Sequence, residues 1–177
     1  MLLERQLKEL IVRQALVEVN REELTEDCMT AVIIEEAMNF LYLRRYTDEG
    51  QYDGVAVLRK DDLSRIQWGG RERDAIARLI SRNPPPPKRP KLRLESFRTI
   101  IPELNAHFGY VTVHTEELDP DICHTGELLD MDSECLLLHQ YGSLQSLDRS
   151  HVMLNFADIT LVESDSIYER TLLSLQE

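Results

Sequence analysis

The chain has 177 residues, of which 42% are hydrophobic, and it carries a formal net charge of −12 at pH 7. This composition suits one globular domain or two small ones. No apolar run approaches the roughly 18 residues of a membrane helix, and charged residues among the first ten positions argue against a signal peptide. Three cysteines without a CxxC pair are typical of a reducing compartment, so we expect a cytoplasmic protein outside the membrane.

The first half of the chain predicts a helix, short strands and a second helix. A stripe of Leu3, Leu7, Leu10 and Ile11 indicates the first helix. Gly69-Gly70 breaks the chain before the second. The strongest hairpin signal is Thr30–Tyr46, in which a polar turn separates two apolar runs. The predicted elements are a helix at 2–14, strands at 15–20, 30–46 (the hairpin), 55–59 and 63–68, and a helix at 71–81.

The stretch 84–94 is predicted to be a linker. It contains four consecutive prolines and four basic residues without an acidic one. Consecutive prolines favour the extended polyproline II conformation, a semi-rigid spacer. Pro84, Pro87 and Arg89 also have the PxxPx+ spacing that aromatic grooves of SH3 domains bind. We expect a spacer, with a docking role as the alternative.

The second half repeats the order of the first. Pro102 is expected to divide the helix at 95–107 or to start it. Ser166 and Glu169 have the spacing of a capping box and predict the last helix. The predicted strands lie at 109–114, 122–131, 134–141, 151–155 and 159–162.

A shift of 94 to 96 residues aligns the two halves. Val17 and Val19 fall on Val111 and Val113, and the hairpin Thr30–Tyr46 falls on Thr125–Tyr141. Because the matches keep their order, we interpret the chain as a tandem duplication. We predict a first domain at 1–83, the linker at 84–94 and a second domain at 95–177.

The second hairpin resembles the first motif of the Sm and Sm-like family. Gly126, the pair Met131-Asp132 and the run Cys135–Leu138 fit that motif, one residue short. The pair of strands 152–154 and 159–162 resembles the second motif in spacing. The resemblance implies a mainly β fold with flanking helices, in which two SH3-like, Sm-like five-stranded barrels are each preceded and followed by a helix.

The positions that bind uridine-rich RNA in Sm proteins differ here. Ser133-Glu134 replaces the turn with its Asn, and Asn155-Phe156 stands where the family has Arg-Gly. The first half keeps Asn39 and has Arg59-Lys60, but Ala37 replaces the Asp. RNA binding therefore does not follow from the resemblance.

Charge also argues against nucleic acid as the main partner. Residues 1–83 hold 13 basic and 16 acidic residues, and residues 95–177 hold three basic and 16 acidic ones. Phosphate backbones are bound mostly by cationic surfaces. If nucleic acid binds, we expect it at the first barrel and linker, through the eight basic residues Arg44, Arg45, Arg59, Lys60, Lys88, Arg89, Lys91 and Arg93.

No pattern of an active site is present. The five histidines all lie in the second half, without HxH or HExxH spacing, and no phosphate-binding glycine loop or G-x-S-x-G elbow occurs. We predict no catalytic residue, no metal and no cofactor, with a metal-dependent enzyme as a distant alternative. The favoured function is a non-enzymatic interaction module that binds an unidentified protein, with homodimerisation through the edge strands of the barrels.

Overall fold

The structure, a computed structural model, describes residues 1–176. Glu177, the last residue of the predicted second domain, lies outside the described residues. The chain forms two compact units, and the division between them falls between Arg89 and Pro90. This boundary falls inside the segment 84–94 that the sequence predicts as a linker. No helix among the described residues is long and apolar enough to cross a membrane.

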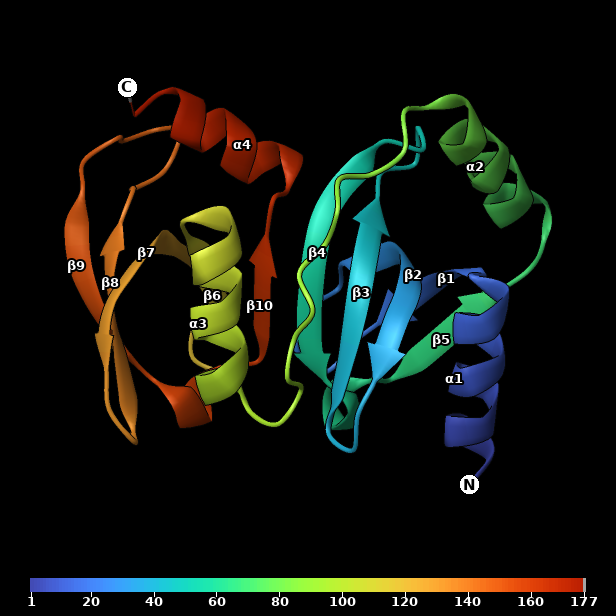
Figure 1. The fold of residues 1–177 in the computed structure, drawn as a ribbon, viewed down its shortest axis with the longest axis horizontal. Helices are drawn as coiled ribbons and strands as arrows, with labels where there is room; N and C mark the ends of the chain where they lie inside the picture. Colours follow the sequence, from blue (N-terminus) through green and yellow to red (C-terminus); the bar gives the residue numbers. More distant parts are fainter. Residues whose placement is uncertain (177) are drawn as a thin grey trace. The chain divides into compact units, whose positions relative to one another are not determined.

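Unit 1 (Met1–Arg89), all of it described, is an antiparallel five-stranded sheet with helices before and after it (Figure 1). The strand order is β5-β1-β2-β3-β4. Helix α1 contacts β2, and α2 contacts β1. The elements are α1 (Leu2–Arg13), β1 (Leu16–Asn20), β2 (Cys28–Glu36), β3 (Phe40–Tyr46), β4 (Tyr52–Arg59), the 3-10 turn η1 (Lys60–Asp62), β5 (Arg65–Trp68) and α2 (Arg71–Arg82).

Unit 2, described from Pro90 to Gln176, has the same succession of elements (Figure 1). Its strand order is β10-β6-β7-β8-β9, and α3 contacts β6, β7 and β10. The elements are α3 (Phe97–Phe108), β6 (Val111–His114), β7 (Cys123–Met131), β8 (Cys135–Gln140), β9 (Ser150–Asn155), the 3-10 turn η2 (Phe156–Asp158), β10 (Leu161–Ser164) and α4 (Ile167–Ser174).

The two units correspond closely along the chain. Helix α3 begins and ends 95 residues after α1, and β7 begins and ends 95 residues after β2. The register shifts between Ile33 and Glu35 in unit 1, and between Leu128 and Asp130 in unit 2. Each unit therefore has the same strand order and a register shift at the same position of its central hairpin.

The fold is mainly β with flanking helices, but neither sheet closes on itself among the described residues. Strands β4 and β5 lie at opposite edges of the sheet in unit 1, and β9 and β10 do so in unit 2. A closed barrel would require these edges to pair. The two predicted five-stranded barrels are thus not shown, and they remain a prediction.

Buried aliphatic side chains hold each sheet to its helices. In unit 1, Leu7 and Leu10 of α1 are 0% and 3% exposed and lie over the sheet, where Ile33 is also fully buried. In unit 2, Ile100 and Leu104 of α3 are fully buried. Burial of one such side chain contributes roughly 1.5–3 kcal/mol, so each unit has a core of its own.

Pro102 does not interrupt its helix, so the prediction of a break or a start there is wrong. Helix α3 runs from Phe97 to Phe108 with Pro102 inside it, and Ser96 caps its N-terminus by accepting a hydrogen bond from the Thr99 backbone. A proline inside a helix removes one backbone hydrogen bond. The burial of Ile101 and its neighbours in the core offsets that loss.

Gly126 permits a close approach of β7 to β8. A Cβ atom placed on Gly126 would lie 2.6 Å from Cα of Gln140, its partner in the β-ladder. Backbone atoms cannot move aside as a flexible side chain can, so glycine is required at this point. The family motif that the sequence resembles also places a glycine here.

Candidate protein interface

Strand β5 presents one free edge. Its single strand neighbour among the described residues is β1. The Ser64 N–H donates to the Asn20 carbonyl at 3.0 Å, and bonding directions alternate along an antiparallel ladder. The Asn20 carbonyl therefore faces β5, and so does the backbone of Glu18, which is paired with Gln67. The backbone N–H and C=O of Ile66, which precedes Gln67, point away from β1. An extended chain could bond to them.

An apolar cavity adjoins this edge. It has a volume of about 380 Å³ and lies between α1, η1 and β5. Leu2 and Leu3 of α1 are 67% and 44% exposed, and Trp68 of β5 is 44% exposed. The predicted apolar stripe of α1 therefore covers the sheet only through its later turns. Exposed apolar side chains gathered around a hollow are typical of an interaction surface.

Strand β9 is an edge strand of unit 2, at the position that β4 has in unit 1. Its single strand neighbour in the described chain is β8. The Phe156 N–H donates to the Glu134 carbonyl at 2.8 Å, so by alternation the Met153 N–H points away from β8. The Met153 side chain is 67% exposed. The side chains of β4 and β10, in contrast, are mostly buried.

A polar network joins β7 to the segment that connects β8 and β9. The Tyr141 hydroxyl donates to Glu127 Oε1 at 2.6 Å, and Arg149 Nη2 lies 3.3 Å from Glu127 Oε2. The hydrogen bond from Tyr141 and the nearby guanidinium of Arg149 lower the pKa of Glu127. Burial and the same hydrogen bond raise the pKa of Tyr141 to about 12. This network ties β7 to both ends of the loop between β8 and β9.

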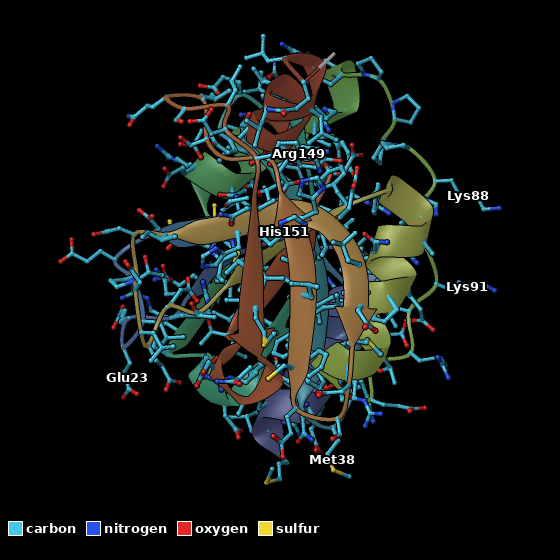
Figure 2. The ribbon with its side chains drawn as sticks, turned by 90° about the vertical axis from the view of Figure 1, so that its left-hand side faces the viewer. Glu23, Met38, Lys88, Lys91, Arg149 and His151 are labelled. Carbon is cyan, nitrogen blue, oxygen red and sulfur yellow. The ribbon has the colours of Figure 1, made fainter. Side chains whose placement is uncertain are left out.

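Two histidines of unit 2 stack against each other, one on β8 and one on β9. His139 of β8 and His151 of β9 are ladder partners, and their rings are parallel with centroids 4.6 Å apart. His151 is on the exposed surface, where Figure 2 shows it on β9. His114 contacts Glu163 at 3.0 Å instead. Among residues 1–176, no three His, Cys, Asp or Glu side chains are placed to hold a metal ion.

Four of the eight basic residues proposed for nucleic-acid contacts are neutralised within their own unit. Lys60 Nζ lies 3.0 Å from Glu36 Oε2. The other three pairs are Arg45 with Asp53 at 3.4 Å, Arg59 with Asp62 at 2.7 Å and Arg93 with Glu103 at 2.7 Å. A carboxylate that occupies a guanidinium or ammonium group competes with phosphate for it.

The other four basic residues are not gathered into one patch. Arg44 is on β3, half-buried, and next to Arg45, whose side chain points to the opposite face because side chains alternate along a strand. Arg89 lies over the ring of Tyr42, with 5.9 Å from Cζ to the ring centroid. Lys88 and Lys91 are exposed and point outward (Figure 2). Arg44, Lys88 and Arg89, which belong to unit 1, therefore form no continuous cationic groove.

One carboxyl group of unit 2 is buried, and the hydrogen bonds that it accepts come from neutral groups. Glu169 of α4 is 1% exposed, and its Oε2 accepts hydrogen bonds from the Ser166 backbone at 2.9 Å and from the Tyr110 hydroxyl at 3.0 Å. Its Oε1 is buried without a hydrogen-bond partner. Burial, and then the charge of Glu163, raise the pKa of Glu169 from 4.5 to about 7. The capping box predicted from the sequence is present, but it gave no sign of this burial.

Sequence reasoning missed the two exposed edges because their exposure depends on which strands pair. The nearest signal is a large apolar residue in a short polar strand, as with Trp68 in Arg65–Trp68 and Met153 in Ser150–Asn155. Without knowledge of the strand register, neither pattern shows whether the apolar side chain lies in the core or on the surface. Comparisons of the chain with models of protein families, with curated proteins and with solved structures found no match.

Proposed function

We propose that the chain is a non-enzymatic assembly module built from two Sm-like small barrels, which binds protein, including a second copy of itself, through the exposed edges β5 and β9. The observation that carries the proposal is that β5 and β9, one edge strand of each unit, each have an outward N–H and an exposed large apolar side chain. Such edges bind partner strands through main-chain hydrogen bonds.

The equal strand order of the units supports an origin by duplication. Asp132 adds support for the Sm-like assignment, because its Oδ1 accepts hydrogen bonds from the backbone N–H groups of Glu134 and Cys135, both at 2.7 Å. These bonds tighten the β7–β8 turn and lower the pKa of Asp132. The Asp and Gly of the family motif therefore have structural reasons to be here.

We expect a dimer, because it is the smallest assembly in which both edges can be paired. Each copy carries one β5 and one β9, which are different surfaces, so a β5–β9 contact is of the head-to-tail kind. Two copies that make this contact twice leave neither edge unpaired. The apolar side chains around β5, including Trp68, would then be covered by the partner strand and by Met153.

The test is the solution mass of variants whose outward N–H is removed. Proline at an outward position of an edge strand removes a donor without breaking the existing ladder. Ile66→Pro and Met153→Pro are expected to convert a dimer into monomers in light scattering at about 100 µM, whereas Ile66→Ala and Met153→Ala, which keep the N–H, remain dimeric.

Circular dichroism establishes that the proline variants are folded. A wild-type protein that is monomeric at this concentration, or a dimer that survives both proline substitutions, would overturn self-association through these edges. The alternative of nucleic-acid binding gains no support from the ion-paired basic residues described above.

A further inference from the structure

The proposed function does not use the segment Asn83–Arg89 of unit 1. In this segment, burial repeats every three residues. Asn83, Pro86 and Arg89 are half-buried. The four residues between them are exposed, namely Pro84, Pro85, Pro87 and Lys88. A polyproline II helix has three residues per turn. Hence one ridge of the helix faces the unit and two ridges face solvent.

Side chains hold this segment at both ends. The Asn83 Nδ2 group donates to the Gly50 carbonyl at 2.8 Å and to the Leu79 carbonyl at 3.2 Å. At the other end, the guanidinium of Arg89 lies over the ring of Tyr42, a cation–π contact. Tyr42 itself is fully buried in β3. The segment is therefore a fixed feature of unit 1, and its conformation exists before any partner arrives.

The exposed ridges carry a defined chemistry. Pro84 and Pro87 share one ridge because they are three residues apart, and Pro85 and Lys88 share the next. Domains that recognise polyproline II insert such prolines between parallel aromatic side chains. The Lys88 ammonium extends away from the chain beside these prolines (Figure 2), where it would meet a carboxylate at the rim of such a groove.

We propose that Pro84–Lys88 is a preformed docking site for a partner domain that has an aromatic-lined polyproline groove with an acidic rim. A ligand that is already ordered loses less conformational entropy on binding than a free peptide. The cation of this site is not the one in the PxxPx+ pattern that the sequence predicts. Arg89 is held on Tyr42, so the structure presents Lys88 instead.

The experiment uses the full chain and a set of purified SH3 and WW domains, two common folds with such a groove. Binding is followed by NMR chemical shifts of the groove residues. At least one domain is expected to bind with a Kd of roughly 1–100 µM. If no domain of the set binds at about 1 mM, the proposal is wrong.

Variants of the two kinds of ridge make the test specific. The double variant Pro84→Ala/Pro87→Ala is expected to weaken binding at least about tenfold, and Lys88→Glu at least about fivefold. Pro86→Ala, on the ridge that faces the unit, is the matched control and should change the Kd less than about twofold. If Pro86→Ala and Arg89→Ala abolish binding while the double variant retains it, the presented face is not the site.

This outcome is independent of strand pairing at β5 and β9. The double proline variant should keep the solution mass of the wild type, because Pro84 and Pro87 lie outside both edge strands. Ile66→Pro should in turn keep its affinity for the groove. Failure of one proposal therefore leaves the other standing.

Discussion

Glu169 makes unit 2 sensitive to pH, and Glu169→Gln removes that sensitivity. The carboxyl is 1% exposed, and the charges nearest it are acidic, since Glu163 raises its pKa after burial itself. Glutamine keeps an oxygen that can accept the hydrogen bonds from Ser166 and Tyr110, but it cannot ionise. A neutral side chain at this position is what the folded unit favours.

The magnitude follows from the shift in pKa. The pKa of Glu169 is raised from 4.5 to about 7, and each unit corresponds to about 1.4 kcal/mol. Because the folded pKa is the higher one, the stabilisation is fully present below pH 4.5 and is lost as the pH rises through 7. The full loss is about 3 kcal/mol, of which about 2.5 kcal/mol falls between pH 5 and pH 8.

Urea unfolding at several pH values between 5 and 8, followed by NMR intensities of α4 and β6, measures the free energy of unfolding of unit 2. The difference between wild type and Glu169→Gln is the decisive quantity, because titrating groups that do not interact with Glu169 contribute equally to both proteins. The wild type should lose about 2.5 kcal/mol relative to the variant over this range. Parallel pH profiles for the two proteins would refute the reasoning.

Three further substitutions test the fold. Gly126→Ala should destabilise unit 2 by about 1–3 kcal/mol in urea unfolding, because its Cβ would press on backbone atoms, whereas an unchanged midpoint would show that β7 can move away. Pro102→Ala should raise the stability of unit 2 by roughly 1–3 kcal/mol by restoring a helix hydrogen bond, and a loss would show that the proline ring is needed for packing. Asp132→Ala should speed amide hydrogen exchange at Cys135, which loses its acceptor, and unchanged exchange would show that the turn holds without it.

The family resemblance was informative at the positions where a local rule applies. Gly126 was part of the motif, and its need for the absence of a Cβ is visible in the ladder between β7 and β8. Asp132 likewise closes a turn within three residues of itself. Closure of the sheets depends instead on strands far apart in the chain, and the structure shows open sheets.

The candidate site was predicted less well than the elements. The eight basic residues were chosen as free cations, but Lys60 is paired with Glu36, which is 24 residues away. Charge counts along a chain do not reveal such pairs. The sequence offers Arg89 as the cation of a docking motif only as the alternative to a spacer, and its contact with Tyr42 likewise joins residues that are far apart in sequence.

The order and type of the elements and the cap of α4 can be predicted from the residues alone. These features depend on neighbouring residues, through helical and strand periodicity, proline geometry and the reach of Ser166 to Glu169. Three features could not be predicted without the folded chain: the identity of the exposed edge strands, the continuation of α3 through Pro102 and the burial of Glu169 near Glu163. These features depend on packing between segments that are far apart in the chain. Burial and strand pairing change the free energy of a group, and the residues next to it in sequence do not determine either.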